Sequence, residues 1–123
     1  MGEIATRESQ FNVPLKNPQK VSIKEITFSQ EHYSRIKKGL YRPEIGNRLF
    51  IFFENNWLYI HRMPGGICMC KAEIKERNGE YYADELFIEG DKEKAPDNHF
   101  TNEGDCMRSF QYILYKLWKE WEN

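Results

Sequence analysis

Hydrophobic residues in the middle of the chain fall in four short runs, which are separated by residues that favour turns. The runs are rich in Phe, Ile, Tyr and Trp, a composition typical of partly buried strands. Each run is too short for a long helix and is bounded by Asn, Gly or Pro. The four predicted strands cover residues 48–54, 57–62, 67–76 and 80–88.

The residues between these runs predict three consecutive hairpins. Asn55-Asn56 can take the positive φ angles of a two-residue loop, and Asn78-Gly79 is the strongest short hairpin signal. Pro64-Gly65 is typical of the two central positions of a type II turn. Together the turns predict a four-stranded antiparallel meander.

One helix is predicted before the meander in the chain, and one is predicted after it. Ser29 fits an N-cap, residues 30–38 fit a short helix and Gly39 fits its end. Near the C-terminus, apolar residues recur at helical spacing and form one continuous stripe. The stripe consists of Cys106, Phe110, Ile113, Leu114, Leu117, Trp118 and Trp121. The predicted fold is therefore α+β, with a short helix before the meander and a long C-terminal helix packed on one face.

The chain divides at about residue 20. Residues 1–20 are polar, contain Pro14 and Pro18, and predict an N-terminal arm. Residues 21–123 have the size of one domain and predict a single α+β domain. Within it, residues 21–28 are β-branched and add a candidate fifth strand.

The Asn55-Asn56 loop determines which residues of the first two strands lie opposite each other. A two-residue loop places Phe52 opposite Tyr59 and Phe50 opposite His61, and opposite residues share a face. One face of the hairpin is then aromatic and the other aliphatic. The C-terminal helix is expected to cover one face. The other face needs the short helix, the arm, a partner subunit or a ligand.

The topology also gathers candidate binding residues at one end of the sheet. A meander alternates its turns between two ends, so the first strand begins where the second and fourth strands end. An arginine fork and approachable glycine N–H groups suit a phosphate group. The alternative is an arginine paired with Glu89 or Asp91, beside a histidine stacked among aromatic rings. The residues expected at this end are Arg48, His61, Arg62, Gly65, Gly66, Glu89, Gly90 and Asp91.

Composition limits the classes of partner and the compartment. The chain has 18 Lys and Arg, 19 Asp and Glu and a net charge of -1, which argues against general nucleic-acid binding. No apolar run approaches the ~20 residues of a membrane span, and no secretory signal precedes residue 20. Three cysteines without such a signal favour a reducing compartment. We therefore predict a cytoplasmic protein with no nucleic-acid or membrane partner.

The cysteines permit a metal site but do not favour one. Cys68 and Cys70 are two residues apart on one predicted strand, so their side chains are expected to point to the same face. With His99 and Cys106 they could make a Cys3His zinc site, although the C-x-C spacing is not that of a zinc knuckle. Free cysteines are more often buried in a core, and no histidine is tied to a thiol by spacing. No cofactor, metal or catalytic residue is therefore predicted.

The segment from Arg48 to about Asp91 resembles a family of small, largely uncharacterised bacterial domains. Their shared pattern is Trp-x-Tyr/Phe-x-His-Arg-x-x-x-Gly, followed one hairpin later by an Asn-Arg-Asp-like triplet. Of the triplet this chain keeps only Asp91. Relatives occur beside ADP-ribose-handling domains, so the resemblance implies a nucleotide-like or ADP-ribose-like ligand. The first pattern is matched by Trp57, Tyr59, His61, Arg62 and Gly66.

These observations predict a small binding domain, not an enzyme, for a phosphate-bearing ligand. Two arginines would contact the phosphate, His61 and Asp91 would orient it, and an aromatic ring would stack on a base. The alternative is a protein-interaction module, such as an immunity, inhibitor or anti-defence protein, which acts through an apolar sheet face. A homodimer through that face is a further expectation. The predicted ligand-binding residues are Arg48, Trp57, Tyr59, His61, Arg62, Gly65, Gly66 and Asp91.

Overall fold

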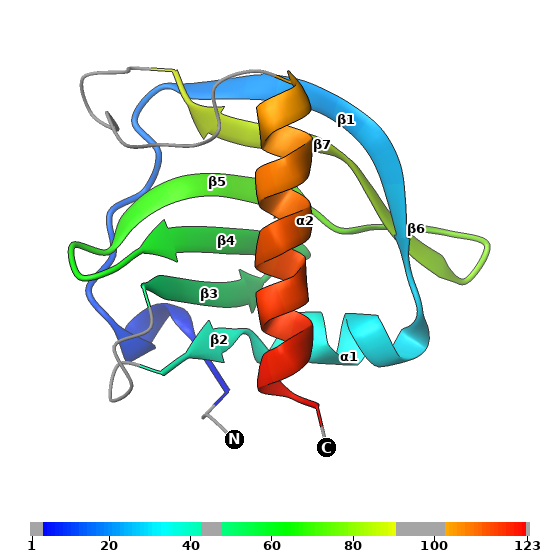
Figure 1. Ribbon diagram of the computed structural model, residues 1–123, viewed down its shortest axis with the longest axis horizontal. Helices are drawn as coiled ribbons and strands as arrows, with labels where there is room; N and C mark the ends of the chain where they lie inside the picture. The colour runs from blue at the N-terminus through cyan, green and yellow to red at the C-terminus, as the bar shows by residue number, and fades with distance from the viewer. Residues whose placement is uncertain (1–3, 43–47, 91–102, 123) are drawn as a thin grey trace.

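The computed structural model describes residues 4–42, 48–90 and 103–122, and it has two main layers (Figure 1). One layer is an antiparallel sheet, and the other is a long helix that crosses one face of it. The elements are η1 (Arg7–Ser9), β1 (Pro18–Phe28), α1 (Gln30–Lys38), β2 (Leu40–Tyr41), β3 (Leu49–Glu54), β4 (Trp57–Arg62), β5 (Ile67–Glu73), β6 (Lys75–Arg77), β7 (Glu80–Glu89) and α2 (Glu103–Glu120).

The α+β class is confirmed, but the count of four strands is wrong. In the described part of the chain the sheet has seven strands in the order β1-β7-β5-β4-β3-β2, with β6 beside β7. β1 and β2 extend the predicted meander at its two edges. The predicted strand 67–76 is divided at Ile74, whose side chain is buried and whose N–H donates to the Asn56 carbonyl at 2.7 Å. This bond continues the register of β4 with β5 by one residue, and Ile74 lies between β5 and β6.

The hairpin between β3 and β4 has the predicted register. Asn55 and Asn56 have φ angles of 52° and 70°, as a two-residue loop of this kind requires. Phe52 lies opposite Tyr59, and Phe50 lies opposite His61. The aromatic and aliphatic faces that were expected from this register therefore form.

The turn between β4 and β5 is not the predicted type II turn. A type II turn needs a positive φ at its third residue, which would be Gly65. Instead Gly66 has the positive φ, at 72°, and the Met63–Pro64 peptide bond is cis. The Gly66 N–H donates to the Arg62 carbonyl at 2.8 Å, so the turn closes over one more residue than expected.

Helix α1 begins and ends at the residues that its sequence predicts. The Ser29 hydroxyl accepts a hydrogen bond from the His32 N–H at 3.0 Å, which satisfies one of the free donors of the first turn. Gly39 follows the helix with φ 70°, and its N–H donates to the carbonyls of Arg35 and Ile36. The helix buries Ile36 completely, and Tyr33 stacks on Tyr81 of β7 at 3.7 Å.

Helix α2 buries its apolar stripe against one face of the sheet, as predicted, and that face is the aliphatic one. This contact forms the main core. Neither helix in the described ranges has the length and apolar character that crossing a membrane requires. The buried helix residues are Cys106, Phe110, Ile113, Leu114 and Leu117, followed by Trp121 just beyond the helix.

Trp121 connects the end of α2 to the end of α1 through a hydrogen bond. Its indole Nε1 donates to the Gly39 carbonyl at 2.7 Å in a buried setting. We expect Trp121→Phe to lower the free energy of unfolding by about 2 kcal/mol, because the substitution leaves a buried carbonyl without its donor. Urea denaturation measures the change, and an unaltered midpoint would show that this hydrogen bond contributes nothing to stability.

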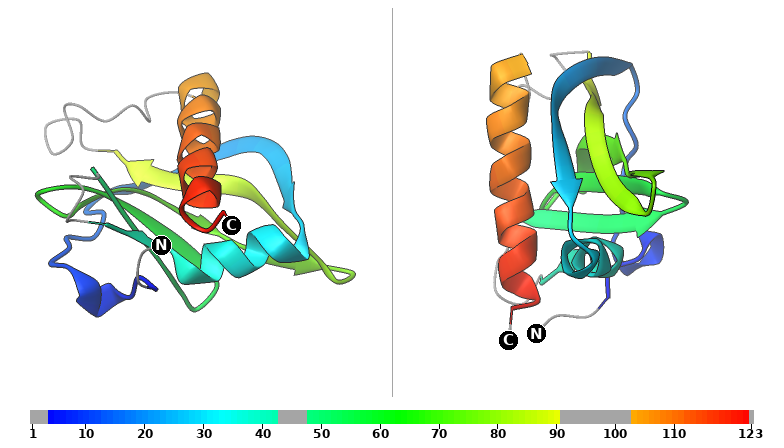
Figure 2. Two further views of the ribbon diagram at one scale, coloured as in Figure 1. Left: turned by 60° about the horizontal axis from the view of Figure 1, so that its bottom comes forward. Right: turned by 90° about the vertical axis from the view of Figure 1, so that its right-hand side faces the viewer.

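The second face of the sheet is covered in part by the N-terminal arm, residues 4–17. Figure 2 shows α2 on one side of the sheet and the arm on the other. Ala5 of the arm is 2% exposed and packs in a small second core with Phe50 and Phe52. The sequence analysis allowed the short helix, the arm, a partner subunit or a ligand to cover this face. In the structure the arm covers part of it.

Candidate functional site

The end of the sheet where the sequence gathers its candidate binding residues is crossed by the backbone of the arm. The Val13 N–H donates to the Gly66 carbonyl at 2.8 Å, and the Cys68 N–H donates to the Val13 carbonyl at 2.9 Å. Further along, the Asn17 carbonyl accepts a hydrogen bond from the Gly90 N–H at 2.8 Å. The arm therefore runs from the β4–β5 turn to the end of β7.

Glu89 at this end binds the arm. Its carboxylate is mostly buried and accepts hydrogen bonds from the N–H groups of Lys16 and Asn17, at 2.9 and 3.1 Å. Hydrogen bonds from backbone donors to a charged group are among the stronger ones in proteins. One role of Glu89 is therefore to hold the arm where it enters β1.

His61 is an interior residue and not an exposed ligand-binding group. Its side chain is 1% exposed, and its ring lies 5.1 Å from that of Phe50 and 5.3 Å from that of Phe52. The Nδ1–H donates to the Phe50 carbonyl at 3.1 Å. Burial lowers the pKa of His61 to about 4, so the ring is neutral at pH 7. It is the stacked histidine that the sequence allowed as the alternative, and it brings no positive charge to a phosphate.

Gly66 has no side chain, which allows the arm to pass close to the turn. A Cβ at this position would lie 2.1 Å from the Phe11 carbonyl oxygen, well inside van der Waals contact. The Gly66 N–H is already bonded to Arg62, so it is not the open donor that a phosphate site needs. Gly65 is exposed at the tip of the turn.

Arg48 and Arg62, the two predicted phosphate contacts, lie on neighbouring strands at the same end of the sheet. Both are exposed, and Arg62 lies opposite Leu49, the neighbour of Arg48, so alternation directs the two side chains to opposite faces. The Arg48 carbonyl accepts a hydrogen bond from the Met63 N–H at 2.7 Å. Asp91, the remaining polar residue of the predicted site, lies outside the described residues.

Trp57 and Tyr59 lie away from the two arginines. Trp57 begins β4 beside the Asn55-Asn56 turn, at the opposite end of the strand from Arg62. Tyr59 stacks on Phe52 at 4.8 Å and has the Arg7 guanidinium 5.1 Å from its ring centre. The predicted residues therefore belong to two separate regions of the sheet, and Arg62 alternates to the face opposite that of Trp57 and Tyr59.

The second region is a cross-strand row that the sequence analysis missed. Tyr59 lies opposite Lys71, and Lys71 lies opposite Phe87, so all three share the face away from α2. The Lys71 ammonium lies 4.8 Å from the ring centre of Trp57 and 5.8 Å from that of Phe87. Trp57, Tyr59, Lys71 and Phe87 are each partly exposed, and we call these four residues the aromatic face.

A one-residue shift in register creates the aromatic face. A hairpin continued without interruption from Asn78-Gly79 would place Lys71 opposite Leu86. β7 advances five positions from Tyr82 to Phe87 while the facing chain advances four, from Lys75 to Lys71, so an extra residue in β7 places Lys71 opposite Phe87 instead. Because side chains alternate between faces, this shift brings Phe87 to the side of Lys71 and leaves Leu86 in the main core. No local signal in the sequence marks the shift.

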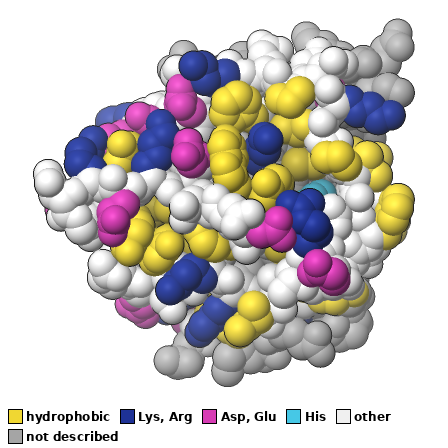
Figure 3. Space-filling model, turned by 180° about the vertical axis from the view of Figure 1, so that it is seen from behind, with side chains coloured by type: hydrophobic (Ala, Val, Ile, Leu, Met, Phe, Trp, Pro, Cys, Tyr) yellow, Lys and Arg dark blue, Asp and Glu magenta, His cyan; other side chains and the backbone are white. Residues whose placement is uncertain are grey.

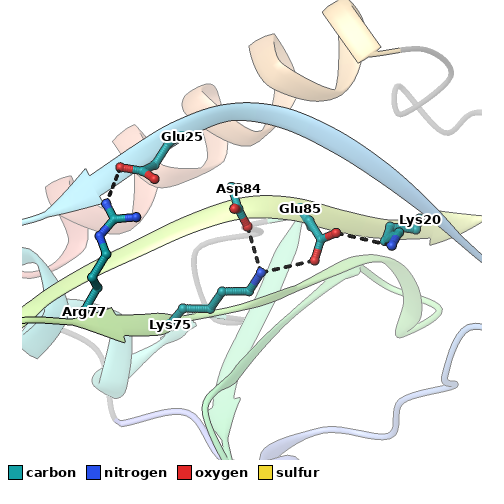
Figure 4. A network of polar contacts seen from close by, with 6 residues as sticks. All are labelled: Lys20, Glu25, Lys75, Arg77, Asp84 and Glu85. Atoms are coloured by element: carbon teal, nitrogen blue, oxygen red, sulfur yellow. Dashed lines mark hydrogen bonds and ion pairs between the residues drawn. The ribbon is translucent and has the colours of Figure 1, made fainter.

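Ion pairs border the aromatic face along β1, β6 and β7 (Figure 4). The Lys75 ammonium lies 2.9 Å from Asp84 and 3.2 Å from Glu85, and the Lys20 ammonium lies 3.4 Å from Glu85. The hydrogen bond from Lys75 lowers the pKa of Glu85. Arg77 pairs with Glu25 at 2.8 Å. The border therefore carries charges of both signs.

Cys68 and Cys70 lie on opposite faces, which corrects the prediction that they share one. A bulge in β5 places Cys68 opposite His61 and Cys70 opposite Ile60, and these two partners are adjacent in β4. Burial raises the pKa of Cys68 to about 12 and that of Cys70 well above its usual range. The two buried thiols therefore stay protonated at neutral pH and are poor nucleophiles.

No metal centre is found where the structure describes the chain. Within residues 4–42, 48–90 and 103–122, no group of three or more His, Cys, Asp or Glu side chains could hold a metal ion. Cys106 is buried in the main core. His99, the fourth residue of the zinc site considered above, lies outside the described residues.

Comparisons of the chain with protein-family models, with curated proteins and with solved structures return no match. The resemblance of the strand-turn motif to small bacterial domains therefore stays a prediction. The function has to be argued from the two regions just described.

Proposed function

We propose that this protein is a protein-interaction module that binds its partner through the aromatic face. The observation that carries the proposal is the arrangement of Trp57 and Phe87, whose ring centres lie 5.6 Å apart with the Lys71 ammonium over both. Figure 3 looks onto this side of the molecule and shows hydrophobic side chains gathered in the upper part of the view, with charged groups among and around them. Partly exposed aromatic rings with a polar border are typical of protein interfaces.

The border argues for a protein partner over a polyanion. A site for phosphate or nucleic acid needs cations that are not already neutralised. Here Lys20 and Lys75 share Glu85 as an acidic neighbour, and Arg77 is paired with Glu25. A mixed border suits a protein surface that offers charges of both signs, because such pairs contribute to specificity and orientation more than to affinity.

The proposal predicts that Trp57 contributes strongly to partner binding. The full chain serves as bait in a lysate of the cells that encode it. We expect the wild type to retain a partner protein, and we expect Trp57→Ala to bind that partner at least about tenfold more weakly. Tyr112→Ala is the matched control, because Tyr112 is a 58% exposed aromatic residue on α2. Equal retention by Trp57→Ala and by wild type, with both folded by circular dichroism, would refute the proposal.

A second candidate function is retained because Arg48 and Arg62 are both exposed at the same end of the sheet. In this function the end of β4 binds a phosphate-bearing ligand, such as a nucleotide or an ADP-ribose-like molecule. We expect such a ligand to raise the Tm of wild type and of Trp57→Ala, but not that of Arg62→Ala, because binding to the folded state stabilises it. A thermal-shift screen of nucleotides and ADP-ribose on the three proteins separates this function from the first.

A further inference from the structure

The N-terminal arm is bound to the sheet through backbone hydrogen bonds and through contacts of its side chains. The backbone is held by the hydrogen bonds of Val13 to Gly66 and Cys68, in the manner of a short parallel strand. Near the start of the arm, the Ala5 N–H donates to the Lys38 carbonyl at 2.7 Å. Backbone pairing of this kind is how proteins bind an added strand from another chain.

Two side chains make this site specific for the arm. Ala5 is 2% exposed and is enclosed in the second core with Phe50 and Phe52. Arg7 donates to the Glu54 carboxylate at 2.9 and 3.1 Å, and its guanidinium lies 4.8 Å from the ring centre of Phe52. The site is therefore complementary in shape and charge to this sequence, whichever copy of the chain supplies it.

Two large apolar side chains of the arm are exposed. Ile4 is 59% exposed and Phe11 is 73% exposed, and Ile67, which lies beside the arm, is 45% exposed. Large apolar side chains this exposed favour burial against another surface. Asn12 holds the arm in shape through its amide, which donates to the carbonyls of Arg7 and Gln10 at 2.9 Å.

We propose that two copies of the chain exchange residues 4–13, so that the arm of each lies in the site of the other. Pro14 and Leu15 form the hinge, while Lys16 and Asn17 stay bound to Glu89 of their own chain. Exchange keeps every contact of the arm and adds burial of Ile4, Phe11 and Ile67 between the copies. Exchange of an identical element is a route to dimers that needs few new contacts. The inference does not rest on the proposed function.

Engineered cysteines test the exchange, because Val13 and Ile67 are bridge partners. Full-length Val13→Cys and Ile67→Cys proteins are mixed at high concentration and mildly oxidised. The three native cysteines are buried, so the engineered pair is expected to react first. Exchange predicts a disulfide between one copy's position 13 and the other's position 67, identified by peptide mapping. Light scattering of the unmodified protein is expected to show a fraction of dimer that increases with protein concentration.

Two outcomes would overturn the proposal. One is a monomer by light scattering at millimolar concentration. The other is a double variant, Val13→Cys with Ile67→Cys, that closes its disulfide only within single chains at that concentration. As a control pair, Tyr112→Cys mixed with Ile67→Cys should give no specific product, since Tyr112 lies on α2. Phe11→Ser should reduce the dimer, because Phe11 is 73% exposed in the single chain and becomes buried only between the exchanged copies.

Discussion

Gly66→Ala is expected to destabilise the protein by about 3–4 kcal/mol. The new Cβ would lie 2.1 Å from the Phe11 carbonyl oxygen, so the backbone of the arm or of the turn must move. Overpacking of this kind costs about 1–3 kcal/mol, and a side chain at the positive φ of Gly66 adds a similar cost. Chemical denaturation measures the loss. Hydrogen exchange at the Val13 and Cys68 amides, both bonded between arm and sheet, shows whether the arm has left its site.

Gly79→Ala is the matched control for this prediction. Gly79 also has a positive φ, at 81°, but a Cβ there would meet no atom within 4 Å. We expect it to cost about 1 kcal/mol, which is the backbone strain alone. If the two variants lost equal stability, the close passage of the arm over Gly66 would contribute nothing to the fold.

Acidification is expected to remove about 3 kcal/mol of stability through His61 alone. In the unfolded chain this histidine takes up a proton near its ordinary pKa of 6.5, whereas in the folded chain burial delays protonation until about pH 4. The unfolded state therefore binds more protons between these values, and the free energy of unfolding falls as pH falls through that window. Below about pH 4 the contribution of His61 levels off. About 2 kcal/mol of the loss should be visible between pH 7 and pH 5 in denaturant titrations.

His61→Phe isolates this contribution. A phenylalanine can occupy the stack between Phe50 and Phe52, but it cannot be protonated and leaves the Phe50 carbonyl without its donor. The variant is expected to be less stable at pH 7 and to lose most of the pH dependence between pH 7 and pH 5. A variant that kept the full slope would show that His61 is not its source.

Local chemistry was sufficient to predict the helices and the hairpin register. Ser29 and Gly39 bound α1 because a hydroxyl cap and a positive-φ glycine act within one turn of chain. The apolar stripe predicted which side of α2 is buried, since helical spacing places those residues on one side. Asn55-Asn56 determined the pairing of β3 with β4 because a two-residue loop permits one register. In each case the cause lies within a few residues of its effect.

The candidate sites depended on contacts between distant segments, which a local pattern does not encode. The sequence placed His61 and the glycines at the correct end of the sheet, but tertiary packing decided their roles, because the histidine is buried and the arm passes over Gly66. An extra residue in β7 shifted the register of β5 against β7 by one residue, which brought Phe87 beside Lys71.

By itself, then, the sequence determined the local elements, the turn-directed pairing of β3 with β4 and the two faces of that hairpin. Only the tertiary structure decided which residues of those faces are exposed, where the arm lies and how β5 meets β7. The physical reason is that capping, helical spacing and tight turns act between near neighbours. The register of strands across an interrupted hairpin and the covering of a face are instead set by packing among segments far apart in the chain.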